Sequence, residues 1–404
     1  MSPAARPGGA ESSTRWGLVA SAWSVYALYK LGRINFSVAV PLLGEEAGLE
    51  ATEIGALAAG FFWVYSLSAL PVGRLADRYG ARLLVGLGLV GSGMMNVLFI
   101  LFSDHFAVAL IVWSANGVFQ AMGWTPLAGG LGRWVSKQRV GRVVASFGSC
   151  FVAGTALTFA IGGLIVERSG VAAVFWAGAA VLIPVGIVWW IGVRDPVSRG
   201  TAGEREEGSI RKVVWLLPPS AAIGVAYVAL IVWTPAYFVE VHAVSVGRSG
   251  LLAAALPASS ILATILVGRL FRSVDAASAT LRGGIMLAAT AVMLFMVSRA
   301  QDLVTGFATI AVASALVGAS SSLVLGIFPR ITAPARAALS SGIFALAFNL
   351  GGGAGSPVLG RLVDRDAWDL VFVFLAGCVM AGALWSCGWY ARGRRGGLGG
   401  RSFA

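Results

Sequence analysis

The sequence predicts an all-α integral membrane protein with twelve transmembrane helices in two pseudo-symmetric six-helix bundles. Three observations support this fold class. The 404 residues are 57% hydrophobic and only 12% charged, whereas soluble domains carry about 25% charged residues. The apolar residues form stretches long enough to cross a bilayer. Two motifs of the first half of the chain recur in the second half.

Hydropathy places six spans in each half of the chain, and each span is about 17–26 residues long, enough to cross with tilt. The first set covers residues 16–41, 53–73, 82–102, 106–129, 142–166 and 171–193. The second set covers residues 213–239, 249–270, 282–298, 303–328, 337–360 and 368–391. We therefore expect a tail at 1–15, a bundle at 16–193, a polar linker at 194–212, a bundle at 213–391 and a tail at 392–404.

The two halves resemble each other in their connecting loops. Gly73-Arg-Leu-Ala-Asp-Arg, after the second span, recurs as Gly268-Arg-Leu-Phe-Arg after the eighth span. Gly163-Leu-Ile-Val-Glu-Arg, after the fifth span, recurs as Arg361-Leu-Val-Asp-Arg after the eleventh. Repeats of this kind predict two related bundles with a binding site at their interface, near the middle of the membrane.

The distribution of lysine and arginine predicts the orientation in the membrane. Of the 30 basic residues, 23 lie in the tails and the even-numbered loops. Only five lie in the odd-numbered loops, and the first of those loops carries Glu45, Glu46, Glu50 and Glu53. Because cytoplasmic loops are enriched in basic residues, we expect a multi-pass plasma membrane protein with both termini in the cytoplasm.

The net charge of +12 does not indicate a nucleic-acid partner, because the cations lie in short turns and not on one basic face interleaved with aromatic residues. The three cysteines fall within apolar spans, and the two histidines are isolated. We therefore expect no metal site and no cofactor. No cleaved signal peptide is expected from residues 1–15.

Two cations stand out because they lie inside an apolar span. Lys30 and Arg33 are about a turn apart on one helical face. Arg33 lies roughly 25 Å along a helix that begins at Trp16, which is below the surface of the hydrocarbon core. An ionised side chain there costs at least ~2.5–3.5 kcal/mol. With no acid in the same span, the pair indicates a water-filled cavity or an anionic ligand.

The loop after the second span, Gly73-Arg-Leu-Ala-Asp77-Arg78-Tyr-Gly-Ala-Arg82, closely resembles the signature loop of the major facilitator superfamily. The resemblance covers the whole chain and implies alternating access between the two bundles. It also implies a cytoplasmic latch between conformations, in which Gly73 allows close helix approach and Asp77 caps a helix or pairs with an arginine. The residues expected to form this latch are Gly73, Asp77, Arg78, Arg82, Arg133 and Arg142.

Two segments are similar to the organophosphate antiporter branch of that superfamily. They are Tyr29-Lys-Leu-Gly-Arg33-Ile-Asn-Phe-Ser and Asn116-Gly-Val-Phe-Gln120-Ala-Met-Gly-Trp124-Thr-Pro126. The resemblance implies that Arg33 binds the substrate. This chain departs from the branch where a second clamp arginine is expected, since it has Tyr227 there. Ala69 and Phe151 replace a lysine and a histidine, and Lys30 is an addition.

These departures indicate a one-sided anion site. Two arginine forks, one from each half, suit a phosphate dianion, but here both cations lie in the first half. The second half offers only neutral groups, so we expect an organic anion whose neutral or aromatic body contacts that half. The residues predicted to bind substrate are Arg33, Lys30, Tyr29, Tyr26, Asn116, Gln120, Trp124, Tyr227, Trp233, Tyr237 and Asn349.

Structural interpretations remain open for several of these residues. Lys30 can extend along its helix toward the interface, and Tyr26 and Tyr29 can simply pack against neighbouring helices. Asn116 and Gln120 are one turn apart and can make an interhelical hydrogen bond instead of lining a cavity. The Trp124-Thr-Pro126 segment can be mainly a helix bend.

The function expected from these observations is secondary active transport of small organic anions, organophosphate or carboxylate, by exchange. No predicted span contains an Asp or Glu in its interior, which favours exchange over a proton-coupled carboxylate or sugar-acid symporter. A membrane sensor that detects an anion without moving it is a further alternative. Enzyme motifs are absent from the sequence. The expected partners are the anionic substrate, a counter-anion or proton, and the lipid bilayer, and a monomer is expected.

Overall fold

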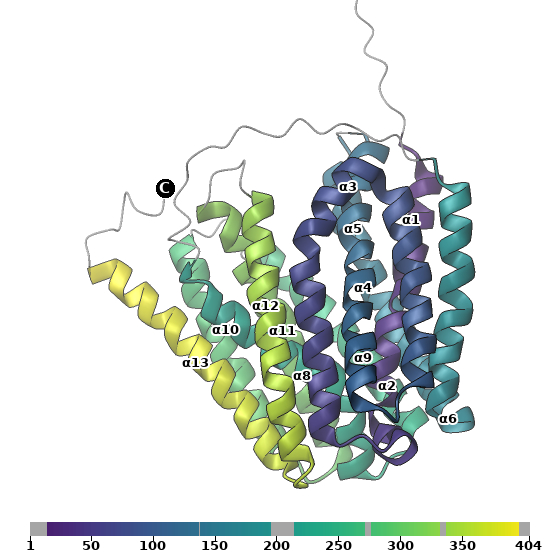
Figure 1. The fold of residues 1–404 in the computed structure, drawn as a ribbon. Coiled ribbons are helices and arrows are strands. Elements are labelled where there is room, and N and C mark those ends of the chain that lie inside the picture. The colour runs from purple at the N-terminus through teal and green to yellow at the C-terminus, as the bar shows by residue number, and fades with distance from the viewer. Residues whose placement is uncertain (1–13, 137, 195–213, 271–275, 332–336, 396–404) are drawn as a thin grey trace, which may run out of the picture.

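A computed structural model describes residues 14–136, 138–194, 214–270, 276–331 and 337–395, and every regular element in these ranges is a helix (Figure 1). The predicted tail 1–15 and linker 194–212 lie almost entirely outside the described residues, as do the last residues of the tail 392–404. In chain order the helices are α1 Trp16–Tyr29, α2 Leu31–Ala47, α3 Ala51–Leu101, α4 Phe106–Trp134, α5 Val140–Phe147, α6 Ser149–Gly192, α8 Leu217–His242, α9 Val246–Leu270, α10 Ala276–Val297, α11 Leu303–Ile331, α12 Ala337–Val363 and α13 Trp368–Arg395.

The first predicted span, 16–41, is divided at Lys30. Helix α1 ends at Tyr29 and α2 begins at Leu31, although Lys30 itself keeps right-handed helical angles (φ −65°, ψ −24°). The backbone N–H of Arg33 donates to the Lys30 carbonyl, three residues back, at 3.2 Å. Hydropathy alone does not reveal this tightened turn, because the segments on both sides of it are apolar.

Helix α3 contains two of the predicted spans, and α6 contains most of two others. Helix α3 has 51 residues, which at ~1.5 Å per residue is more than twice the thickness of a bilayer core. It is interrupted at Gly80 (φ +76°), and α6 is interrupted in the same way at Gly170 (φ +79°). Positive φ is inexpensive only for glycine. The chain therefore reverses at these two glycines. The segment 74–81, which separates the second and third predicted spans, is helical except at Gly80.

The helices of the second half follow the predicted spans closely. Helix α8 corresponds to 213–239, α9 to 249–270, α10 to 282–298, α11 to 303–328, α12 to 337–360 and α13 to 368–391. Within the described ranges, nine helices are long and apolar enough to cross a membrane. That number counts α3 and α6 once each, although each of them reverses and crosses twice. It also omits α1 and α2, which together form one crossing, so it is consistent with twelve crossings.

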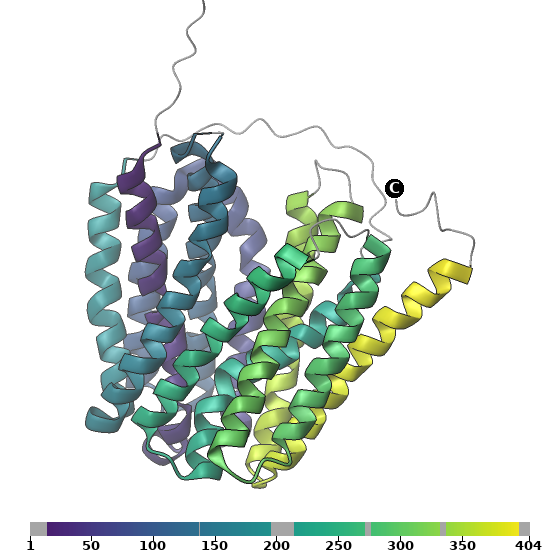
Figure 2. The same cartoon turned by 180° about the vertical axis from the view of Figure 1, so that it is seen from behind.

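The helices form two groups in space (Figures 1 and 2). Helices α1–α6 lie together on one side and α8–α13 on the other, and the start of α1 and the end of α13 lie at the same end of the molecule, called here the termini side. The groups pack through α3 against α12, α6 against α9, and α2 against α8. Toward the termini side the ribbons diverge, and α13 tilts outward.

Contacts between the groups are tightest at the opposite side. The Asp364 carboxylate, just beyond α12, accepts hydrogen bonds from the backbone N–H groups of Ala51 and Thr52 at 2.7 and 3.0 Å. It therefore caps the first turn of α3. Glycines let the backbones approach, since a Cβ at Gly55 would meet the Ser356 carbonyl and one at Gly360 would meet the Ala51 carbonyl. Small residues of this kind drive close helix packing in membranes.

Candidate functional site

Lys30 lies in the middle of the molecule at the junction of α1 and α2. Its side chain is buried, with 2% of its surface exposed. The Nζ atom donates a hydrogen bond to the Tyr26 hydroxyl at 3.2 Å and lies 3.9 Å from the centroid of the Phe151 ring. A ring face attracts a cation, so Phe151 and Tyr26 supply part of the solvation that the ammonium group has lost. Lys30 does not extend to a water interface in this structure.

Arg33 is one turn further and is also buried, with 8% of its surface exposed. Its guanidinium carbon lies 5.2–5.6 Å from the ring centroids of Phe61, Phe62 and Tyr65, all on α3. The Nε atom is buried without a hydrogen-bond partner. Leaving a buried donor unpaired costs about 1–3 kcal/mol, and more for a charged group. The guanidinium therefore keeps bonding capacity that an incoming anion can use.

No acidic residue balances these two charges in the described part of the chain. The ion pair that the structure records there joins Asp104 and His105 at 2.9 Å, in an exposed turn between α3 and α4. In the same ranges, no three His, Cys, Asp or Glu side chains gather closely enough to hold a metal ion. The cation pair is thus a concentration of uncompensated positive charge inside an apolar core, which is the electrostatic requirement of an anion site.

An amide network holds the turn that carries the cations. Gln120 Nε2 donates to the Tyr29 carbonyl at 3.2 Å and Asn116 Nδ2 donates to the Gly32 carbonyl at 2.7 Å. Ser92 links the two side chains, since its hydroxyl accepts from Gln120 and donates to Asn116 Oδ1, both at 2.8 Å. Side chains that insert into the helical hydrogen-bond ladder bend helices. The donors of Asn116 and Gln120 are therefore used to stabilise the break at Lys30.

The aromatic residues predicted on the first half of the site have different surroundings. The Tyr29 hydroxyl donates to the Phe119 carbonyl at 2.8 Å and holds α1 against α4. Trp124 packs edge-on against Tyr26, with ring centroids 5.2 Å apart. Of these three residues, Tyr26 contacts the Lys30 ammonium. Tyr29 and Trp124 pack against Tyr26.

The predicted residues of the second half have different surroundings. Tyr227, on α8, lines the cavity between the two groups of helices and packs against the Phe348 ring at 5.1 Å between centroids. Trp233 Nε1 donates to the Ser356 hydroxyl at 3.3 Å, and Asn349 Nδ2 donates to the Ala345 carbonyl of its own helix at 2.7 Å.

Tyr237 lies near the far end of α8 and is not grouped with the cations. Its hydroxyl is 3.1 Å from His242 Nε2, and its ring packs edge-on against Trp368 and Phe372. These contacts place it at the opposite side of the molecule, where the chain enters α13.

Three residues around Arg33 were not predicted from the sequence. Phe61, Phe62 and Tyr65 form the aromatic wall that faces its guanidinium. Their spacing on α3, at positions i, i+1 and i+4, puts them on one helical face. The signal that was available is this Phe-Phe-x-x-Tyr pattern in the span next to a buried arginine.

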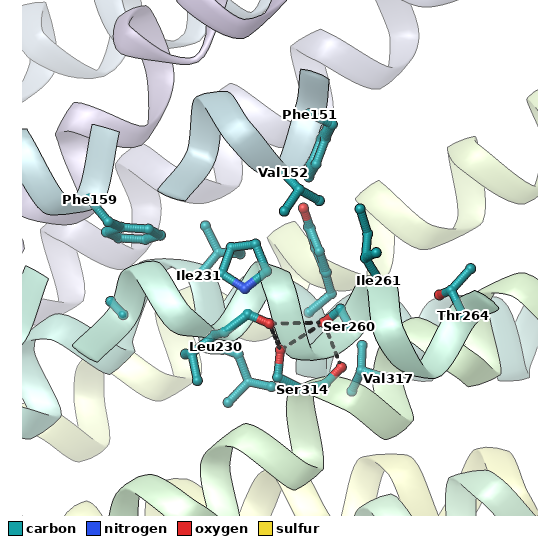
Figure 3. Close-up of a pocket in the computed structure, with 14 residues that line it drawn as sticks. Phe151, Val152, Phe159, Leu230, Ile231, Ser260, Ile261, Thr264, Ser314 and Val317 are labelled. Atoms are coloured by element: carbon teal, nitrogen blue, oxygen red, sulfur yellow. Dashed lines mark hydrogen bonds between the residues drawn. The ribbon is translucent and has the colours of Figure 1, made fainter. Parts of the chain in front are cut away.

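A cavity of about 130 Å³ lies between the two groups of helices, where α6 meets α8, α9 and α11 (Figure 3). Phe151, whose ring centroid lies 3.9 Å from Lys30 Nζ, lines it, and so does Tyr227. A smaller hollow of about 10 Å³ adjoins Arg33, and Ile231 lines both spaces. The cavity and the cation pair are thus neighbours through Phe151 and Ile231, with charge from the turn between α1 and α2 and volume mainly from α8, α9 and α11.

The predicted latch lies toward the termini side. Arg82 Nε donates to the Trp190 carbonyl at 2.6 Å, which ties α3 to α6. Arg78 stacks over its neighbour Tyr79 at 5.3 Å, and Asp77 and Arg142 are exposed while Arg133 is half-buried. A Cβ at Gly73 would make only an ordinary contact with Thr125, at 3.6 Å. The close approach expected at Gly73 is not present in this conformation, and the latch stays a prediction.

Similarity to curated proteins points to organophosphate transporters. The glycerol-3-phosphate transporter of Bacillus subtilis is 26% identical over 402 residues, covering 88% of each chain. A probable hexose phosphate transport protein of Chlamydia pneumoniae is 28% identical over 176 residues, or 43% of this chain and 38% of that relative. The membrane sensor protein UhpC of Escherichia coli is 34% identical over 119 residues, or 30% of this chain and 27% of the sensor. The alignments with the last two thus cover less than half of each relative.

Solved structures show the same fold. A bacterial homologue of the human lysosomal transporter Spinster aligns with a TM-score of 0.79 at 16% identity, covering 97% of this chain and 98% of that one. The nucleoside transporter NupG aligns with a TM-score of 0.75 at 12% identity. Residues 22–356 match the Major Facilitator Superfamily model. The predicted resemblance to that superfamily and to its organophosphate branch is confirmed, and the chain is a multi-pass membrane protein that belongs to the Major Facilitator Superfamily.

Proposed function

We propose that this protein is a secondary transporter of small organic anions, organophosphates or carboxylates, with Arg33 and Lys30 binding the anionic group. The observation that carries the proposal is the burial of both cations without an acidic partner in the described ranges, together with the unpaired Nε of Arg33. A buried charge is expensive unless it is paired. An anion that enters the site removes that cost and supplies acceptors for the guanidinium.

Exchange of one anion for another is the coupling that the charges favour. A symporter that carries protons uses a titratable group inside the membrane, and the carboxylates of the described residues lie at or near the helix ends and in turns. In an exchanger, the unoccupied site is the costly state because two like charges face each other there. Binding of either anion relieves this repulsion, so the two bundles change access more readily when loaded.

The proposal includes an orientation in the membrane and an oligomeric state. The basic loops orient both termini toward the cytoplasm of a bacterial-type inner membrane, which makes the termini side the cytoplasmic side. Each group of helices supplies its own wall of the site, so one chain contains a complete path and the working unit is a monomer.

Uptake into proteoliposomes tests the proposal. Vesicles are preloaded with inorganic phosphate, and entry of labelled glycerol 3-phosphate and of a labelled carboxylate is measured with and without a pH gradient. We expect uptake that depends on the preloaded anion and is lost in Arg33→Lys, since a point charge does not reproduce a planar fork. Uptake that depends on the pH gradient alone contradicts exchange and supports the symporter.

An anion sensor is a second candidate, favoured by the 34% identity to the sensor UhpC over 119 residues. The two candidates differ in a single measurable property. A sensor binds the anion at Arg33 but shows no uptake above empty liposomes, whereas a transporter shows saturable uptake. Binding of phosphate by the purified protein, measured on the same preparation, separates an inactive sample from a sensor.

A further inference from the structure

The cavity beside the cations is apolar, which bears on the chemistry of the cargo. Of the 14 side chains that line it, the hydrocarbon ones predominate and include Leu230, Leu256 and Val317. Branched and aromatic groups line it where α8, α9 and α11 meet α6. A ligand group that enters this space exchanges water for hydrocarbon, which favours apolar groups by about 25 cal/mol per Å² buried.

Two of the four hydroxyl groups in the cavity wall, those of Ser260 and Ser314, are already bonded within the protein. The Ser260 hydroxyl contacts the Leu256 and Ser314 carbonyls at 3.3 and 2.8 Å, and the Ser314 hydroxyl contacts the Leu256 carbonyl at 3.2 Å. The two hydroxyls also lie 2.9 Å from each other, as the dashed lines in Figure 3 show. A sugar ring placed here would lose its water and leave several hydroxyls unpaired, each at a cost of about 1–3 kcal/mol.

The size of the cavity limits the group that fits. Its volume of about 130 Å³ is comparable to an apolar engineered cavity of about 150 Å³ that binds benzene. A phenyl ring or a short alkyl chain therefore fills it. Phe151 lines the cavity and its ring centroid lies 3.9 Å from Lys30 Nζ, so a single side chain contacts both the ammonium and the cavity, and a small ligand can span the two.

We infer that the cargo is an amphiphilic monoester or acid, with a phosphate or carboxylate head on Arg33 and Lys30 and a phenyl or short alkyl body in this cavity. The inference rests on the proposed function and narrows it, because it places polyhydroxylated sugar phosphates among poor ligands. The first half of the chain selects the charge of the cargo, and the second half selects its apolar body.

Two homologous series of anionic ligands, titrated calorimetrically into the protein in nanodiscs, test the inference. One series runs from inorganic phosphate through methyl, propyl, pentyl and phenyl phosphate, with glucose 6-phosphate as the polar comparison. The other runs from acetate to hexanoate, with gluconate. We expect Kd to fall about fourfold per added methylene until the cavity is full, and pentyl phosphate to bind more than about tenfold tighter than glucose 6-phosphate.

A pair of substitutions on α9 provides the matched control. Ala253 is fully buried and lines the cavity, whereas Ala255, two residues on, is exposed. Ala253→Leu fills part of the space and should remove most of the gain along the series while inorganic phosphate binds as before. Ala255→Leu adds the same bulk outside and should leave the whole series unchanged. A thermal melt of each variant shows that it is folded.

The outcomes separate the two claims. A Kd that does not change along both series, or glucose 6-phosphate as the tightest ligand, overturns the apolar body while anion binding at Arg33 stands. Equal binding of pentanol and pentyl phosphate also overturns it, since the cavity would then act alone. If no anion binds, or if Arg33→Gln binds every anion as the natural protein does, the proposed function fails as well.

Discussion

The two walls of the central site differ in kind. The wall from α1–α4 carries both cations, and its polar side chains Asn116, Gln120 and Ser92 are fixed by hydrogen bonds to the backbone that bears them. The wall from α8, α9 and α11 carries no described charge at the cavity, and the hydroxyls of Ser260 and Ser314 are bonded across α9 and α11 to carbonyls of the neighbouring helix. We therefore propose that two bundles with related loop motifs divide charge recognition and shape recognition between them.

This asymmetry follows from the cost of a buried charge. Two cations on one turn repel each other and have lost most of their water, so they need rigid support and an environment that partly replaces that solvation. The amide network supplies the support, and the rings of Phe61, Phe62, Tyr65 and Phe151 supply the environment. With no cation to place on the other wall, that wall is free to be hydrocarbon.

The largest expected effect comes from neutralising the charged wall. Arg33→Gln should weaken phosphate binding by at least about 30-fold, because a lost partner of a buried charge pair costs 2–5 kcal/mol. The ligand-free variant should melt no lower than the natural protein, since the Arg33 Nε has no partner to lose. Arg299→Gln, at an exposed arginine that stacks on Phe295, is the control and should change neither property.

Replacing the second cation should have a smaller effect. Lys30→Met keeps the apolar stem but removes the ammonium, which already has Tyr26 and Phe151 as partners. We expect a loss of about 1.5–3 kcal/mol in binding free energy, the usual value of a hydrogen bond to a charged group. Calorimetric titration with phosphate measures it. An unchanged Kd would mean that Lys30 serves packing alone and that Arg33 is the whole anion site.

Removing one support of the charged wall should lower the stability of the protein without changing its affinity for phosphate. Gln120→Met leaves the Tyr29 carbonyl without its donor, so we expect the free energy of unfolding to fall by about 1–3 kcal/mol. The Kd for phosphate, measured below the melting range, should stay close to that of the natural protein. A large loss of affinity with unchanged stability would instead place Gln120 in direct contact with the anion.

The smallest expected effect concerns the contact that joins the two walls at the opposite side. Asp364→Asn removes the charge that caps α3 while it keeps an acceptor oxygen. We expect a slight fall in melting temperature and easier separation of the halves on that side, measured by distances between spin labels. Asp366→Asn, at a neighbouring exposed aspartate, controls for the change in charge. Identical behaviour of the two variants would exclude a role for this cap.

Much of the charged wall could be predicted from the sequence because its energetics are visible there. Lys30 and Arg33 interrupt an apolar span, and ionised groups in such spans are rare unless they have a function. The span boundaries of the second half were close for a similar reason, since each is bounded by charged or turn-forming residues. The break at Lys30 could not be predicted, because it depends on donors from α4 that are about 90 residues away in the chain.

The apolar wall was harder to predict because neutral residues carry no comparable signal. Tyr227 and Tyr237 are both tyrosines on α8, but ten residues separate them by about 15 Å along the helix. Tyr227 lines the cavity between the two groups of helices, whereas Tyr237 packs against Trp368. Whether a serine hydroxyl is available to a ligand depends on its rotamer and its neighbours. For Ser260 and Ser314 only the packed structure shows that their hydroxyls are already bonded.

The most direct test of the divided site is a structure of the protein with bound 4-bromophenyl phosphate. Anomalous scattering locates the bromine independently of the rest of the ligand. We predict a bromine peak inside the cavity, near Leu256 and Val317, with the phosphate oxygens within hydrogen-bond distance of Arg33 Nε and of Lys30 Nζ. A bromine peak outside that cavity, or a phosphate held by arginines elsewhere in the molecule, would contradict the account.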